Sequence, residues 1–151
     1  MKCPHCLGDI EKKTKPRSLD QMRRFFAVLR AMYAHWPEDC GFQPHSEEHL
    51  RKWVTCMAGH REVIKTMTLP QTDNPSLAAA MMGIVEALLE IDGRFGRWKG
   101  MTFAVYEAKS IAFHKLSQSE FNKLNDEVEA VYASETGLDP ETVLREHERA
   151  A

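Results

Sequence analysis

Two cysteines near the start of this 151-residue chain have the spacing of a metal site. Cys3 and Cys6 are separated by two residues, the first a proline, and a glycine follows shortly after. A tight turn of this kind can place two thiolates at two corners of a zinc tetrahedron. The two missing ligands could come from Cys40 with His45, from Cys56 with His60, or from the same turn in a second subunit. The sequence therefore predicts half of a zinc site, and the alternative is a pair of free thiols that bind nothing.

Residues 45–49, with the sequence H-S-E-E-H, have residue types that could support metal-dependent hydrolysis. They lack the H-E-x-x-H arrangement, in which both histidines and the glutamate base lie on one helix. Ser46 is a good helix cap, so His45 should lie outside the helix that follows. The rest of the sequence offers no set of nucleophile, base and oxyanion donors and no two-carboxylate metal centre. We therefore expect a protein without catalytic activity.

Basic and aromatic residues alternate in residues 92–100. Arg94, Arg97 and Lys99 are interleaved with Phe95 and Trp98 among three glycines. The glycine spacing is not that of a phosphate-binding P-loop. A flexible turn of this composition could hold a single nucleic-acid strand through phosphate contacts and ring stacking. A plain connecting loop is the alternative.

A second basic segment begins the first expected helix, which should run from residue 19 to residue 35. Ser18 can cap this helix and Gln21 can complete the capping box. Arg23 and Arg30 lie seven residues apart on one face, which should stay cationic. The apolar stripe of this helix is expected to consist of Leu19, Met22, Phe26, Leu29, Tyr33 and Trp36.

The segment from Arg17 to Phe26, R-S-L-D-Q-M-R-R-F-F, resembles the corresponding stretch of the NinB (Orf) family of lambda-like phages. These proteins are recombination mediators that bind single-stranded DNA, and a weaker similarity follows in residues 108–121. The resemblance implies that Gln21 and Phe26 contact DNA, although Phe26 stands where the family has a tryptophan. Burial in the core is the alternative for Phe26.

The resemblance also implies partners. NinB-like proteins act as homodimers whose subunits enclose a DNA-binding channel, which Gln21 and its neighbouring arginines would line. They help to load a recombinase past single-strand binding protein, so both of these proteins are implied as partners. The expected location is the cytoplasm of a host cell.

Length and charge are consistent with one nucleic-acid-binding domain. Residues 1–16 should form the cysteine knuckle and a basic linker, and residues 17–151 a single α+β domain with a small antiparallel sheet packed with several helices. The formal net charge is only −2, but basic residues predominate in 1–30 and 94–115, and acidic residues in 117–151. A local basic surface of this kind suits phosphate backbones. Solvated charge without a partner is the alternative.

The other expected elements follow from local patterns. Residues 61–69 should form a strand, residues 101–113 should form one long strand or a pair, and helices should begin at the caps Ser46, Ser117 and Asp139. The short final helix that starts at Asp139 and Pro140 should be acidic and exposed. Residues 77–91 form a helix that is apolar all round, so we expect it to be central, although it is too short to span a membrane. With no signal peptide apparent, a soluble protein is expected.

The sequence leads to one preferred function and two alternatives. The preferred function is single-stranded DNA binding without catalysis by a phage-type recombination mediator. The alternatives are a metal-dependent phage nuclease and a zinc-stapled adaptor that contacts other proteins. The predicted DNA-binding residues are Arg17, Gln21, Arg23, Arg24, Phe26, Arg94, Arg97, Trp98 and Lys99.

Overall fold

The computed structural model describes residues 19–91, 94–112 and 115–151, which form five helices and one antiparallel sheet of three strands. The predicted α+β class is therefore confirmed. Cys3, Cys6, Arg17 and Ser18, the expected cap of the first helix, lie outside the described residues. The elements are α1 (Leu19–Ala34), α2 (Glu47–Met57), β1 (Arg61–Thr68), α3 (Pro75–Ile91), β2 (Phe95–Lys99), β3 (Thr102–Ala108), α4 (Gln118–Thr136) and α5 (Pro140–Ala150).

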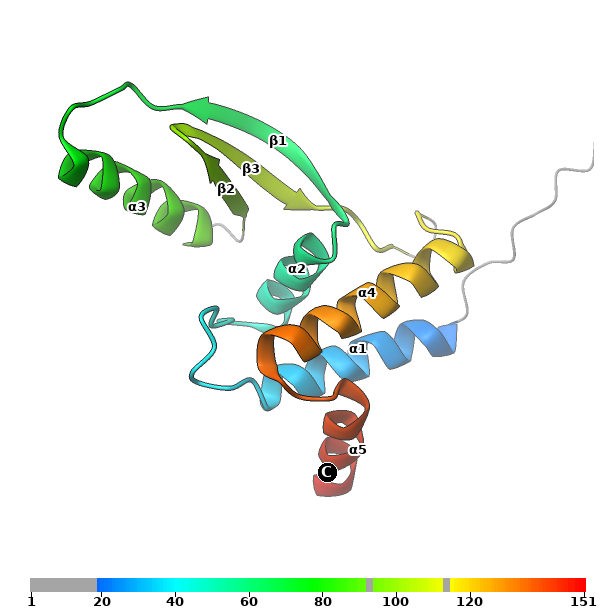
Figure 1. Ribbon diagram of the computed structural model, residues 1–151. Coiled ribbons are helices and arrows are strands. Elements are labelled where there is room, and N and C mark those ends of the chain that lie inside the picture. Colours follow the sequence, from blue (N-terminus) through cyan, green and yellow to red (C-terminus); the bar gives the residue numbers. More distant parts are fainter. Residues whose placement is uncertain (1–18, 92–93, 113–114) are drawn as a thin grey trace, which may run out of the picture.

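Four helices make a body that holds the main hydrophobic core. α1 packs against α5 and α2, and α4 packs against α2 and α5. The sheet and α3 extend from this body on the side of α2 (Figure 1). The core comprises Phe25, Val28, Leu29, Ala31, Met32, Leu50, Trp53, Val54, Ile111, Phe121, Leu124, Val128, Tyr132, Val143 and Leu144.

The caps expected at Ser46, Ser117 and Asp139 are confirmed by the geometry of the helix ends. Ser46 Oγ accepts the backbone N–H of His49 at 3.0 Å, and Ser117 with Glu120 forms a complete capping box. Gly137 ends α4 with a φ of +69°, a backbone conformation that suits glycine. Asp139 caps α5, and Pro140 occupies the first turn. These features depend on neighbouring residues alone, which explains why the sequence indicates them clearly.

The apolar stripe expected on α1 is confirmed in part: Leu29 is buried and three further members pack against the core, but the most buried face is shifted around the helix. Phe25, Val28 and Met32 are buried, whereas Leu19 is 62% exposed. Phe25 contacts the ring of Phe121 on α4, with ring centroids 5.6 Å apart. The buried face of α1 is thus set by where α4 and α5 lie, which periodicity along α1 does not specify. For the same reason α5 is not wholly exposed, because it buries Val143 and Leu144.

The sheet has the strand order β1-β3-β2, so β3 is central and both of its neighbours are edge strands. Residues 95–99 form strand β2, whereas a flexible turn was expected there. Arg97 pairs with Ala104, and Lys99 pairs with Thr102. The turn that joins β2 to β3 contains Gly100, whose φ is +61°. Pairing with β3 therefore fixes the basic residues of β2 along an edge of the sheet.

The expectation that the helix at 77–91 is central is wrong. α3 lies at the periphery, with its contacts mainly to β2 (Figure 1). Leu77, Ile84 and Leu88 are 50%, 60% and 62% exposed. Its apolar composition indicates a need for burial but does not specify what covers it. No helix in the described part of the chain is long and apolar enough to cross a membrane.

Candidate nucleic-acid interface

The α1 residues predicted to bind DNA lie beside α4. The side-chain amide of Gln21 accepts a hydrogen bond from Gln118 of α4. Arg23 has a 79% exposed side chain and approaches Asp20 at 3.5 Å. That distance and exposure indicate a weak surface ion pair. Gln21 is thus engaged with α4, and Arg23 extends into solvent.

Arg24 joins three helices. Its guanidinium lies 3.3 Å from Glu129 of α4 and also pairs with Glu141 of α5. The hydrogen bond with Glu141 raises the pKa of Arg24 above its ordinary value, against the opposing effect of burial. Phe26 is half-buried and packs against the core, with its ring at right angles to that of Phe25. Arg24 and Phe26 therefore have structural contacts that compete with a DNA-binding role.

The second predicted group lies on β2 and just before it. Arg94, Arg97 and Lys99 are exposed. Trp98 is half-buried and its ring lies 4.6 Å from that of Phe103. The indole N–H of Trp98 is buried and has no hydrogen-bond partner among the described residues. Arg97 and Lys99 thus extend from this edge strand into solvent, while Trp98 packs into the sheet.

The two groups lie at different ends of the molecule. The start of α1 adjoins α4, whereas β2 lies beyond α2 next to α3 (Figure 1). Those predicted residues that the structure describes therefore do not form one continuous surface on a single chain. The group on β2 adjoins a cavity, and the group on α1 borders a polar hollow that includes Asp126 of α4.

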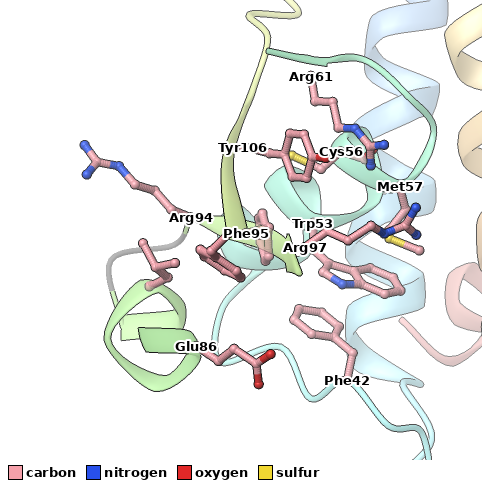
Figure 2. Close-up of a pocket in the computed structure, with 13 residues that line it drawn as sticks. Phe42, Trp53, Cys56, Met57, Arg61, Glu86, Arg94, Phe95, Arg97 and Tyr106 are labelled. Carbon is pink, nitrogen blue, oxygen red and sulfur yellow. The ribbon is translucent and has the colours of Figure 1, made fainter. Parts of the chain in front are cut away.

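A cavity of about 260 Å³ lies between α2, the sheet and α3 (Figure 2). Aromatic rings form much of its lining. Phe42 and Trp53 are stacked, with their centroids 4.2 Å apart and their planes 4° from parallel. Phe95 of β2 and both Phe103 and Tyr106 of β3 complete the aromatic part. These flat apolar surfaces are suited to contact another flat ring.

Three arginines line the cavity or its mouth. Arg61 lies over the ring of Tyr106, 4.4 Å from its centroid, and donates a hydrogen bond to the carbonyl oxygen of Cys56 at 3.3 Å. Figure 2 shows the side chains of Arg61 and Arg97 both running toward Met57, whereas Arg94 points away. The single carboxylate among the described lining residues, Glu86, lies on the other side near Phe42 (Figure 2). The mouth beside Met57 is therefore cationic.

Sequence reasoning found Arg94 and Arg97 but missed four other residues of this cavity. Arg61 and Tyr106 lie in segments that the sequence predicts only as strands, and the sequence assigns no role to Phe42. Trp53 lies on the buried side of α2, with an exposure of 9%. These four residues are distant along the chain, and only the packing of the sheet against α2 brings them together.

The cysteines and histidines considered as further zinc ligands have other contacts. Cys40 Sγ donates a hydrogen bond to the carbonyl oxygen of Glu135 at 3.3 Å. Cys56 is buried, and this burial raises the pKa of its thiol to about 11. A ring nitrogen of His60 lies 3.3 Å from the carbonyl oxygen of Ser110. The described residues contain no group of three or more His, Cys, Asp or Glu side chains placed to hold a metal ion.

His45 and His49 are stacked, with ring centroids 3.8 Å apart. His45 lies before the cap of α2, as expected, and its backbone N–H donates a hydrogen bond to Nδ1 of His49. His49 is 2% exposed and its ring is also stacked with that of Phe95. This histidine pair therefore joins α2 to β2 and to the aromatic wall of the cavity.

Comparison with known proteins found no protein-family model, no curated protein and no solved structure that matches this chain.

Proposed function

We propose that this protein binds single-stranded DNA without catalysis and acts as a phage-type recombination mediator in the host cytoplasm. The observation that carries the binding proposal is the cationic edge of β2 beside an aromatic-lined cavity. Phosphates need accessible cations, and unpaired bases need ring surfaces. The role in recombination rests on the resemblance of Arg17–Phe26 to NinB-like proteins.

Phosphate contacts would come mainly from Arg97 and Lys99, with Arg94 and Arg61 nearby. Arg97 and Lys99 are exposed and project from the same edge strand, two residues apart. In a strand, residues two apart point to the same side. A row of two cations on one face can follow a flexible phosphate backbone. Gln21 and Arg23 would supply a second, separate contact region near the start of α1.

The adaptor alternative has one observation in its favour, the exposed apolar face of α3. Leu77, Ile84 and Leu88 lie on one helical stripe. Exposed apolar stripes of this kind mark protein contacts.

We propose that α3 contributes to a homodimer, and that recombinase and single-strand binding protein are further partners. Zinc bound through Cys3 and Cys6 remains part of the proposal.

A salt titration with single- and double-stranded oligonucleotides tests the function. Arg97→Ala with Lys99→Ala should weaken single-strand binding strongly. For single strands the logarithm of affinity falls with the logarithm of salt by about 0.7 per phosphate contact. Removal of two contacts should therefore make the slope of log affinity against log salt less steep by roughly 1.4. The matched control is Arg145→Ala with Arg149→Ala, which removes two exposed cations of α5 and should leave binding unchanged.

The outcomes separate the proposed function from its alternatives. Affinity that does not depend on salt, or that is equal in both double variants, would contradict binding through β2. Cleavage of the oligonucleotide that stops on addition of a chelator would establish the nuclease alternative. Absence of any DNA binding, together with zinc in the purified protein, would favour the adaptor.

A further inference from the structure

The size of the cavity between α2, the sheet and α3 limits what it can hold. Its volume is about 260 Å³. Cavities for drug-sized ligands range from about 300 to 1,000 Å³. This cavity lies just below that range, so it suits one small flat group rather than a folded segment of chain.

The lining favours a flat aromatic group. Phe42 and Trp53 are fixed in a parallel stack, and Phe42 also contacts Phe95, with ring centroids 6.4 Å apart. Trp53 is 9% exposed. Its orientation is therefore set by the core before any ligand arrives. A wall that is already ordered loses little side-chain entropy when a ring packs against it.

The charge at the mouth favours an anion attached to that group. Arg61 and Arg97 come from the two edge strands, and both extend toward Met57 (Figure 2). Arg61 is held by Tyr106 and by the carbonyl oxygen of Cys56, so its guanidinium is oriented in advance. Glu86 lies on the other side of the cavity (Figure 2). An aromatic ring joined to a phosphate matches both parts of this site.

We infer that the cavity receives one unpaired base of the bound strand while Arg97 and Arg61 contact the adjoining phosphate. This inference rests on the proposed function and adds a defined subsite to it. A base in a duplex is already stacked and paired, and it must be flipped out before it can enter a pocket. The cavity would therefore account for a preference for single strands, which surface cations alone do not provide.

The test compares a short oligothymidine with an abasic oligomer of the same length, which has the phosphates but no bases. The full-length chain should bind oligothymidine about tenfold or more tightly than the abasic oligomer, because stacking of one base on an aromatic ring raises the affinity by a factor of about ten or more. Met57 lines the cavity and is 44% exposed, so Met57→Trp should fill the cavity without disturbing the core. This variant should bind both oligomers with the affinity that the unchanged protein has for the abasic one.

Met57→Leu is the matched control, because it conserves volume and should keep the preference for bases. Equal binding of both oligomers by the unchanged protein would overturn the base subsite and leave phosphate binding intact. A preference that Met57→Trp retains or increases would mean that bases stack elsewhere, which also overturns the subsite. Failure of the unchanged protein to bind either oligomer would contradict the proposed function itself.

Discussion

The ring of Phe103 in β3 lies directly over Gly96 in β2. A Cβ atom added at Gly96 would lie 2.0 Å from Cζ of Phe103, closer than any real contact allows. Phe103 is 1% exposed, so an added methyl group would force its ring out of its packed position. Gly96→Ala should therefore lower the free energy of unfolding by about 1–3 kcal/mol, the range for overpacked cores. Thermal unfolding followed by circular dichroism measures this as a decrease of several degrees in Tm.

Gly41→Ala is the control for this change. A Cβ atom at Gly41 would meet no atom within 4 Å, and its φ is not in the left-handed region. Its Tm should stay within about a degree, because surface substitutions usually change stability by less than 0.5 kcal/mol. An unchanged Tm in Gly96→Ala would contradict the close packing of β2 on β3.

Arg24 should contribute to stability where its neighbour Arg23 does not. Arg24 pairs with Glu129 and Glu141, whereas Arg23 only approaches Asp20 from an exposed position. Because Arg24 is 44% exposed in its side chain, Arg24→Ala should cost about 1 kcal/mol at low salt, and Arg23→Ala less than about 0.5 kcal/mol. Chemical denaturation at two salt concentrations measures both, and high salt should reduce the difference. Equal effects of the two substitutions would contradict a three-helix role for Arg24.

Cap residues show what the sequence can predict. Ser46, Ser117 and Asp139 were identified correctly, because each acts on backbone groups within four residues. The position of α3 was predicted wrongly, and the buried face of α1 was predicted only in part. Both depend on elements far away in the chain. Periodicity indicates which residues of a helix are apolar, but it does not indicate which other elements will cover them.

In the candidate site, too, the sequence indicates the residues within one short segment but not those that only the fold brings together. Arg94 and Arg97 stand out because basic and aromatic residues alternate around them, a signal within one short segment. The cavity beside them combines that segment with Phe42, Trp53 and Arg61. No spacing rule connects these residues, because α2 and the sheet meet only in the folded chain.

Acid should weaken the fold through two helix caps. Glu120 accepts the backbone N–H of Ser117, and Asp139 accepts hydrogen bonds from Thr142. These bonds hold the pKa of both carboxyls below their ordinary values. The charged forms are thus favoured in the fold, so their contribution is present above pH values of about 4 to 5 and is lost as the pH falls through the lowered pKa values. Glu120→Gln with Asp139→Asn keeps hydrogen-bond acceptors at both caps, so Tm should fall less steeply between pH 5 and pH 3 than in the unchanged protein.

The exposed stripe of α3 should control self-association. Leu77, Ile84 and Leu88 lie at spacings of seven and four residues, which places them within about 40° of one another around the helix. Ile84→Glu puts a charge in the middle of this stripe, where a dimer would have to bury it, and buried unpaired charges are strongly unfavourable. Ile84 is 60% exposed in the single chain, so the fold should tolerate the change. Sedimentation should show a dimer for the unchanged protein and a monomer for Ile84→Glu.

Ala79→Glu is the control, because it adds the same charge at an exposed position about 140° away from Ile84 around the helix, and it should remain dimeric. A monomer in all three proteins would mean that this stripe does not bind a second copy of the chain.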